Sequence, residues 1–267
     1  LFMKALKRFA REDPTFNVLK DPETHETLIA GMGELHLEIY VERMRREYEL
    51  AVILGKPRVN FRETITQPLP FDFTLRKQSG GAGQYARLIG RLEPIDESEG
   101  ITKEFVNSVL GNNIPPNYIP AVDKGYEDML GKGPMIGNPV ERVRMILLDG
   151  AYHAVDSSEF AFRNATHMAF TEAFMKASPS LLEPIMSIEI QTPLEFQSPV
   201  ISTLNKRRGT VTNATIEGSI CVIEAEVPLA LMFGYATELR SASEGKGEFT
   251  MEYKQHKLVQ QDRLAGI

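Results

Sequence analysis

Five side chains that can carry chemistry lie within a short stretch, DGAYHAVDSSE at 149–159. They are Asp149, His153, Asp156, Ser157 and Glu159. A histidine near carboxylates and a hydroxyl could act as a general base for a nucleophile, which is the arrangement of a hydrolase. The spacing matches neither an HExxH pattern nor an EF-hand loop. Asp156 or Ser157 is instead expected to cap the following helix, with Glu159 in its first turn. A hydrolase that uses Asp149 and His153 remains an alternative.

Glycine is unusually dense in QSGGAGQY, at 78–85. Because glycine costs chain entropy on folding, either a tight turn or a close approach to the backbone should require it. A thin hairpin end would let main-chain N–H groups face RNA phosphates or a minor groove. Three cations nearby would add a positive field: Arg76, Lys77 and Arg87.

Two further patterns could bind a ligand. GMGELH (31–36) has the first two glycines of a dinucleotide fingerprint but lacks the third and the preceding strand and turn, so a turn into an amphipathic helix is expected. Lys206, Arg207 and Arg208 precede Gly209, where cations complement the end of a helix. No CxxC pattern that would hold zinc occurs.

Composition sets the frame for these motifs. The sequence has 267 residues, 42% hydrophobic and 25% charged, which favours two or three globular domains and contains no run that could span a bilayer. A single cysteine, Cys221, excludes an internal disulfide and favours a reducing compartment. The net charge of −6 argues against a wholly basic surface but leaves local RNA contacts open. Because the sequence starts at Leu1 and at once reads as helix, we expect a piece of a larger protein.

The pattern of residues 1–62 predicts helix, strand, helix, strand. The first helix should end near Asp13-Pro14, and a β-like run lies in THETLIAG at 24–31. GELHLEIYVERMRREY (33–48) has helical spacing of apolar residues, and ELAVILGKPRVNF (49–61) has two strand-like pieces. This order resembles a ferredoxin-like βαββαβ unit without its opening strand.

The middle of the sequence predicts a hairpin and two helices. FDFTLRKQ (71–78) and YARLIGRLEPI (85–95) both alternate with period two around the glycines. Residues 96–140 are loop-rich with a short helix at 120–130, a buried strand covers 143–150, and a long helix covers 157–177. From Pro179 onward the order is a complete βαββαβ.

Five motifs in the same order resemble elongation factor G. They are GMGELHLE (31–38), FRETI (61–65), KQSGGAGQY (77–85), VDSSEFAF (155–162) and FGYATELRSASEGKGEFTMEY (233–253). The resemblance covers the family's domains III, IV and V, and no GxxxxGK[ST] phosphate loop occurs. It implies an α+β protein in which two ferredoxin-like domains (1–62 and 179–267) flank an elongated α/β arm (63–178) with a ribosomal-protein-like fold.

The resemblance also implies roles for residues. The arm would enter the small-subunit decoding centre, where its two tips would contact RNA and should lie together. The expected contacts are Gln78, Ser79, Gly80, Gly81, Ala82, Gly83, Gln84, Tyr85, Gly150, His153, Asp156 and Ser157. Lys206, Arg207 and Arg208 would contact large-subunit RNA. No catalytic or metal-binding residue is expected here.

The function implied is that of the C-terminal half of a GTP-dependent ribosomal translocase, acting on transfer RNA and messenger RNA as a monomer without a membrane. GTP and Mg would belong to the full-length protein only, so this sequence alone should lack activity. A ribosome-recycling or ribosome-protection paralogue and an assembly scaffold stay open. Ala82 stands where bacterial members usually carry arginine, which resembles the mitochondrial type and favours the mitochondrial matrix over a bacterial cytoplasm or another organelle.

Overall fold

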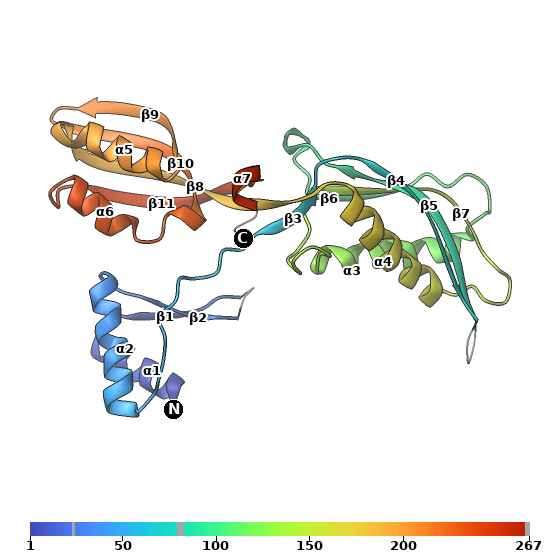
Figure 1. Cartoon of the computed structure of the whole chain (residues 1–267), viewed down its shortest axis with the longest axis horizontal. Coiled ribbons are helices and arrows are strands. Elements are labelled where there is room, and N and C mark those ends of the chain that lie inside the picture. Colours follow the sequence, from blue (N-terminus) through green and yellow to red (C-terminus); the bar gives the residue numbers. More distant parts are fainter. Residues whose placement is uncertain (23–24, 79–82, 265–267) are drawn as a thin grey trace. The chain divides into compact units, whose positions relative to one another are not determined.

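A computed structural model describes residues 1–22, 25–78 and 83–264. The chain divides into two compact units, one made of residues 1–60 and 183–257, the other of residues 61–182 and the segment from Leu258 onward. Figure 1 shows the helices and strands of each part along the chain. No helix in the described ranges is both long enough and apolar enough to cross a membrane.

Residues 1–60 form two helices and a two-stranded sheet. Helix α1 (Phe2–Glu12) is followed by β1 (Asn17–Lys20), β2 (Thr27–Ala30) and helix α2 (Glu34–Tyr48). The two strands are antiparallel, with Asn17 opposite Ala30. Both helices and the segment before β1 supply the core, which contains Ala5, Leu6, Phe9, Phe16, Tyr40 and Met44.

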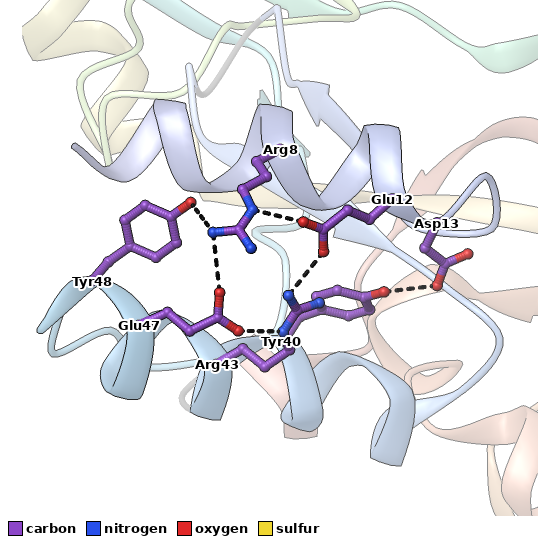
Figure 2. Close-up of polar contacts among 7 residues, drawn as sticks. All are labelled: Arg8, Glu12, Asp13, Tyr40, Arg43, Glu47 and Tyr48. Atoms are coloured by element: carbon purple, nitrogen blue, oxygen red, sulfur yellow. Dashed lines mark hydrogen bonds and ion pairs between the residues drawn. The ribbon is translucent and has the colours of Figure 1, made fainter.

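Charged side chains join α1 to α2 (Figure 2). Arg43 donates to Glu12 at 2.8 Å and to Glu47 at 2.7 Å, while Arg8 donates to Glu12 at 2.6 Å. Arg8 also lies 3.3 Å from Glu47 and donates to the Tyr48 hydroxyl at 3.1 Å. The hydrogen bonds from Arg43 and Arg8 hold the pKa of Glu12 below its ordinary value. Single exposed ion pairs contribute little, but this connected set favours one register of the two helices.

Asp13 collects hydrogen bonds at the end of α1. It accepts from the Thr15 N–H at 2.8 Å and the Thr15 hydroxyl at 2.7 Å, from His36 Nε2 at 2.8 Å and from the Tyr40 hydroxyl at 2.9 Å. These bonds, those of Thr15 first, hold the pKa of Asp13 well below its usual range. His36 Nδ1 accepts from the Met32 N–H at 3.2 Å, so GMGELH forms the predicted turn into a helix.

The element order of this part differs from the expected helix, strand, helix, strand. Two strands lie between the helices, and the described structure assigns no strand to residues 49–61. Leu50 and Val52 of that segment pack against the core of the two helices, whereas Ile53 is 97% exposed. The segment therefore contributes apolar packing without ladder hydrogen bonds, and its apolar residues do not imply a strand.

Residues 61–182, called the middle domain below, contain a four-stranded sheet with two helices. Their elements are β3 (Arg62–Ile65), β4 (Leu69–Lys77), β5 (Gln84–Pro94), β6 (Lys103–Asn107), α3 (Ile119–Gly131), β7 (Val143–Ala151) and α4 (Glu159–Lys176). The strand order is β4-β5-β7-β6, in which only β6 and β7 are parallel. The predicted hairpin is confirmed, with Phe73 opposite Leu88 and Lys77 opposite Gln84. Strand β6 was not expected.

One face of this sheet is buried against the helices. Alternate residues of the strands, among them Leu75, Ala86, Leu88, Met145 and Leu147, belong to one core with side chains of α3 and α4. Helix α4 fits because alanines at 161, 165, 169 and 173 let it pack closely while Phe162, Phe170 and Phe174 fill the core. This packing holds β5, β7 and α4 together in one layer of sheet and one of helix.

Strand β3 carries a fully buried carboxylate, Glu63. It accepts the backbone N–H groups of Met135, Ile136 and Asn138 at 2.7, 2.8 and 2.9 Å. Gly133 lies so close that a Cβ there would be 2.2 Å from Glu63 Oε2. The loop between α3 and β7 thus wraps around this carboxylate, which gives FRETI a structural role.

Residues 183–257, the C-terminal domain, follow the predicted βαββαβ order. They contain most of β8 (Pro179–Pro193), then α5 (Gln197–Lys206), β9 (Thr210–Glu217), β10 (Ile220–Pro228), α6 (Tyr235–Ala242) and β11 (Glu248–Leu258). The strand order is β11-β8-β10-β9, and one core contains side chains of the sheet and of both helices. The first four residues of β8 pair with β3, and α7 (Gln261–Leu264) ends the described chain. The mixed α+β class is confirmed.

Candidate nucleic-acid interface

The tip loop, residues 152–158, connects β7 to α4 and contains His153. The side chain of His153 is 53% exposed. Its Nδ1 accepts the backbone N–H groups of Asp156 at 3.1 Å and Val155 at 3.3 Å. An imidazole nitrogen that accepts hydrogen bonds carries no proton, so in the neutral ring the proton is on Nε2. Nδ1 also lies 3.3 Å from Asp156 Oδ2, and the structure gives no hydrogen bond from Nε2 to another described residue.

Two hydrogen bonds hold the tip loop against the start of β5, and a third lies within the loop. The Tyr85 N–H donates to the Asp156 carbonyl at 2.9 Å. The Ser157 hydroxyl donates to the Tyr85 carbonyl at 2.6 Å and accepts from the His153 N–H at 2.9 Å. The Tyr85 and His153 rings lie 6.1 Å apart between centroids. The two predicted tip elements are thus in contact through residues 83–85 and 153–157.

The side chain of Asp156 explains why residue 83 of QSGGAGQY is a glycine. A Cβ at Gly83 would lie 2.3 Å from Asp156 Oδ1 and 2.6 Å from its Cγ. The close neighbour of this backbone is a side chain of the same protein. Ser79, Gly80, Gly81 and Ala82 lie outside the described residues.

The remaining hairpin residues differ in their exposure and in their contacts within the protein. Gln78 is exposed, while Gln84 is half-buried and its Oε1 accepts from Asn164 Nδ2 at 3.4 Å. Arg76 and Lys77 are exposed. Arg87 instead forms a bidentate pair with Asp72, which corrects the expectation that it adds to the positive field.

The Asp72 pairing has bonds of 2.9 and 2.6 Å and raises the pKa of Arg87. A cation paired so closely contributes little field at a distance. The positive charge near the hairpin end therefore rests on Arg76 and Lys77.

Gly150 is buried between strands, which corrects the expectation that it lies exposed at the tip. It is buried opposite Leu88, and a Cβ there would lie 2.2 Å from the Arg87 carbonyl oxygen and 2.6 Å from Ile114. Gly150 is needed for close strand packing.

The cap of α4 is Ser158, not Asp156 or Ser157. The Ser158 hydroxyl accepts from the Ala161 N–H at 3.1 Å. Asp156 lies over Gly83, and Ser157 bonds to Tyr85. Glu159 is in the first turn, as predicted.

The hydrolase alternative finds no support in this geometry. The Ser157 hydroxyl donates to a carbonyl rather than to the imidazole. Asp149 accepts from Asn113 at 2.9 Å and from the Gly150 N–H at 2.8 Å, and these bonds, that of Asn113 first, lower its pKa. Within the described ranges no group of three or more His, Cys, Asp or Glu could hold a metal. A hollow of about 220 Å³ lies between β4 and α4 and is lined by residues 69–73 and part of α4, but not by His153.

In the C-terminal domain Arg207 serves the fold. Its guanidinium donates to Glu238 at 2.7 Å, to the Phe233 carbonyl at 3.1 Å and to the Leu231 carbonyl, and lies over the Tyr235 ring. Lys206 and Arg208 are exposed. Of the three predicted cations, those two are the ones whose side chains face solvent.

Models of one protein family match nearly the whole chain. The model described as "Elongation Factor G, domain III" matches residues 2–56, "Elongation factor G, domain IV" matches 57–178, and "Elongation factor G C-terminus" matches 180–266. The three matches follow one another in the order of the motifs.

Curated proteins with similar sequences include mitochondrial and bacterial ones. The chain is 54% identical over 266 residues to "Elongation factor G-1, mitochondrial" of Arabidopsis thaliana, covering 100% of this chain and 35% of that protein. It is 51% identical to "Elongation factor G 2" of Bdellovibrio bacteriovorus, covering 96% and 36%. It is 52% identical to "Elongation factor G 1" of Syntrophus aciditrophicus, covering 97% and 37%. The chain thus spans little more than a third of the length of these relatives.

A solved structure has the same fold. A crystal structure of a protein from Thermus thermophilus matches with a TM-score of 0.83 and 35% identity, covering 99% of this chain and 39% of that one. The similarity extends over all three parts of the chain.

Proposed function

Because the chain belongs to the elongation factor G family, we propose that it is the C-terminal part of a ribosomal translocase. In this proposal the full-length protein promotes GTP-dependent movement of transfer RNA and messenger RNA during elongation. GTP and Mg²⁺ would bind outside residues 1–267. We take residues 1–62, 63–178 and 179–267 as the three domains, the second of which is the arm that reaches the small-subunit decoding centre.

The observation that carries this proposal is the geometry of the tip loop. The His153 side chain is half exposed, and Arg76 and Lys77 supply exposed positive charge on the adjoining hairpin. An imidazole N–H donor beside cations suits the phosphate and ribose oxygens of RNA. We infer that the RNA-contacting residues include Gln78, Tyr85 and His153, together with 79–82.

The mechanism we propose is steric and requires no covalent step in this chain. The end of the middle domain would occupy the site that a transfer RNA leaves and would hydrogen bond to the decoding-centre RNA. Its presence would disrupt the contacts that hold transfer RNA there and block backward movement. The support for this comes from the sheet and α4, whose packed core includes Leu147 before the tip loop and Ala161 after it.

Replacing His153 with alanine in the full-length factor tests the proposal. We expect translocation to slow about tenfold, because a hydrogen bond to a charged RNA oxygen is lost. Ribosome-stimulated GTP hydrolysis should stay near the wild-type rate, because His153 has no role in it. Stopped-flow measurement of messenger RNA movement and of phosphate release gives both rates. Equal loss of both rates, or of neither, would count against the proposal.

We propose small- and large-subunit ribosomal RNA as partners, with Lys206 and Arg208 on the large-subunit side, and a monomeric protein. Residue Ala82 and the similarity to the Arabidopsis mitochondrial protein support the mitochondrial matrix as its location. Fractionation of source cells with an antibody against this chain would test that; recovery in the cytosol alone would contradict it.

A further inference from the structure

We propose that Ser157 is a positioning residue that joins the tip loop to the hairpin and so sets where His153 stands. This inference rests on the proposed function, because the consequence of moving His153 is read in translocation. Ser157 itself is half-buried and is not required to touch RNA. Its role is to act through His153.

The Ser157 hydroxyl bridges two elements that are far apart in the sequence. It donates to the Tyr85 carbonyl at the start of β5 and accepts the His153 N–H within the tip loop. A second bond in the loop, from the Ser157 N–H to the His153 carbonyl at 3.1 Å, does not involve the side chain. Removing the hydroxyl would therefore cut the link to the Tyr85 carbonyl and the bond from the His153 N–H, and would leave the bond from the Ser157 N–H to the His153 carbonyl in place.

Gly83 and Asp156 form a second contact beside this bridge. The Asp156 side chain lies where a Cβ of residue 83 would be, and the Tyr85 N–H bonds to the Asp156 carbonyl. The Asp156 N–H in turn donates to His153 Nδ1. Two N–H groups orient the imidazole, those of Asp156 and Val155. Asp156 contacts Gly83 and Tyr85, and Val155 is the residue before it in the loop.

The chain offers a matched control at the next residue. Ser158 also has a bonded hydroxyl, but it caps α4 through the Ala161 N–H, and among the described residues it bonds to neither Tyr85 nor His153. Ser158→Ala should lower the stability of α4 without releasing the loop from β5. Ser157→Thr keeps the hydroxyl and serves as the conservative variant.

The test uses the full-length factor with Ser157→Ala, Ser157→Thr and Ser158→Ala, each alone, and with Ser157→Ala combined with His153→Ala. We expect Ser157→Ala to slow translocation about threefold and to speed hydrogen exchange in peptides that contain Tyr85 and His153. Ser157→Thr should restore both, and Ser158→Ala should change neither. In the His153→Ala background the Ser157 substitution should cause no further slowing, because both act through one side chain.

Two results would overturn the role of Ser157. One is unchanged exchange at Tyr85 and His153 in Ser157→Ala; the other is equal slowing by that substitution with and without His153. If His153→Ala alone leaves translocation unchanged, the proposed function fails. Hydrogen exchange alone then tests whether Ser157 joins the tip loop to the hairpin. Faster exchange at both residues in Ser157→Ala would still support the bridge, and unchanged exchange would overturn it.

Discussion

Replacing Glu63 with alanine is expected to lower the free energy of unfolding of the middle domain by roughly 3–5 kcal/mol. Glu63 is fully buried, and its carboxylate is the acceptor for the N–H groups of Met135, Ile136 and Asn138. Removing it leaves three donors facing a cavity. A buried donor without an acceptor costs its full desolvation free energy.

Urea unfolding of the chain, followed by a probe in the middle domain, measures this effect. Glu172→Ala is a suitable control, because Glu172 is 54% exposed on α4 and pairs with Lys176 at the next turn. Such a pair contributes about 0.5 kcal/mol or less. Similar losses in the two variants would mean that the loop from 133 to 138 does not depend on Glu63.

Two substitutions of His153 distinguish the roles of its two ring nitrogens. We expect the asparagine and glutamine variants to differ in translocation rate. An asparagine oxygen occupies about the place of Nδ1 and can accept the N–H groups of Val155 and Asp156. A glutamine amide nitrogen occupies about the place of Nε2 and can donate outward. If the outward N–H is the group that contacts RNA, His153→Asn should slow translocation about tenfold and His153→Gln about threefold or less.

The opposite order would show that the imidazole acts mainly by supporting the loop. Hydrogen exchange at Val155 and Asp156 provides the internal control, since it should be preserved in His153→Asn and increased in His153→Gln. Slowing by both variants to the level of His153→Ala would mean that ring stacking rather than hydrogen bonding is required.

The elements that could be predicted from the sequence are those with strong periodicity. FDFTLRKQ and YARLIGRLEPI alternate because one face of each strand meets α4, and that pattern is visible without coordinates. The βαββαβ order after Pro179 is equally regular. By contrast, KEFVN of β6 is short and mostly polar, and its strand pattern is correspondingly weak. The strand prediction for residues 49–61 was wrong for the opposite reason: apolar side chains there pack against the core although the segment has no partner strand.

The contacts of the candidate site depend on residues far apart in the sequence. Consecutive serines at 157 and 158 both suit a helix cap, and only the structure separates the cap from the bridge to Tyr85. Nothing in the sequence links Gly83 to Asp156, 73 positions later (156 − 83). Gly150 adjoins the tip loop in sequence, yet the backbone of the neighbouring strand lies where a side chain at this position would be. His153 lies in the loop between a strand and a helix, where its side chain is 53% exposed.

The proposal that the end of the middle domain contacts the decoding centre is tested most directly by probing RNA from Val155. This side chain is 83% exposed in the tip loop, and Cys221 is buried, so Val155→Cys adds an accessible thiol for an iron chelate. Ile53→Cys, at a 97% exposed position of residues 1–60, is the control. With the full-length factor bound to ribosomes, we predict hydroxyl-radical cleavage of small-subunit RNA at the decoding centre from position 155 and none there from position 53. Cleavage from position 155 that is confined to other RNA segments would contradict the account.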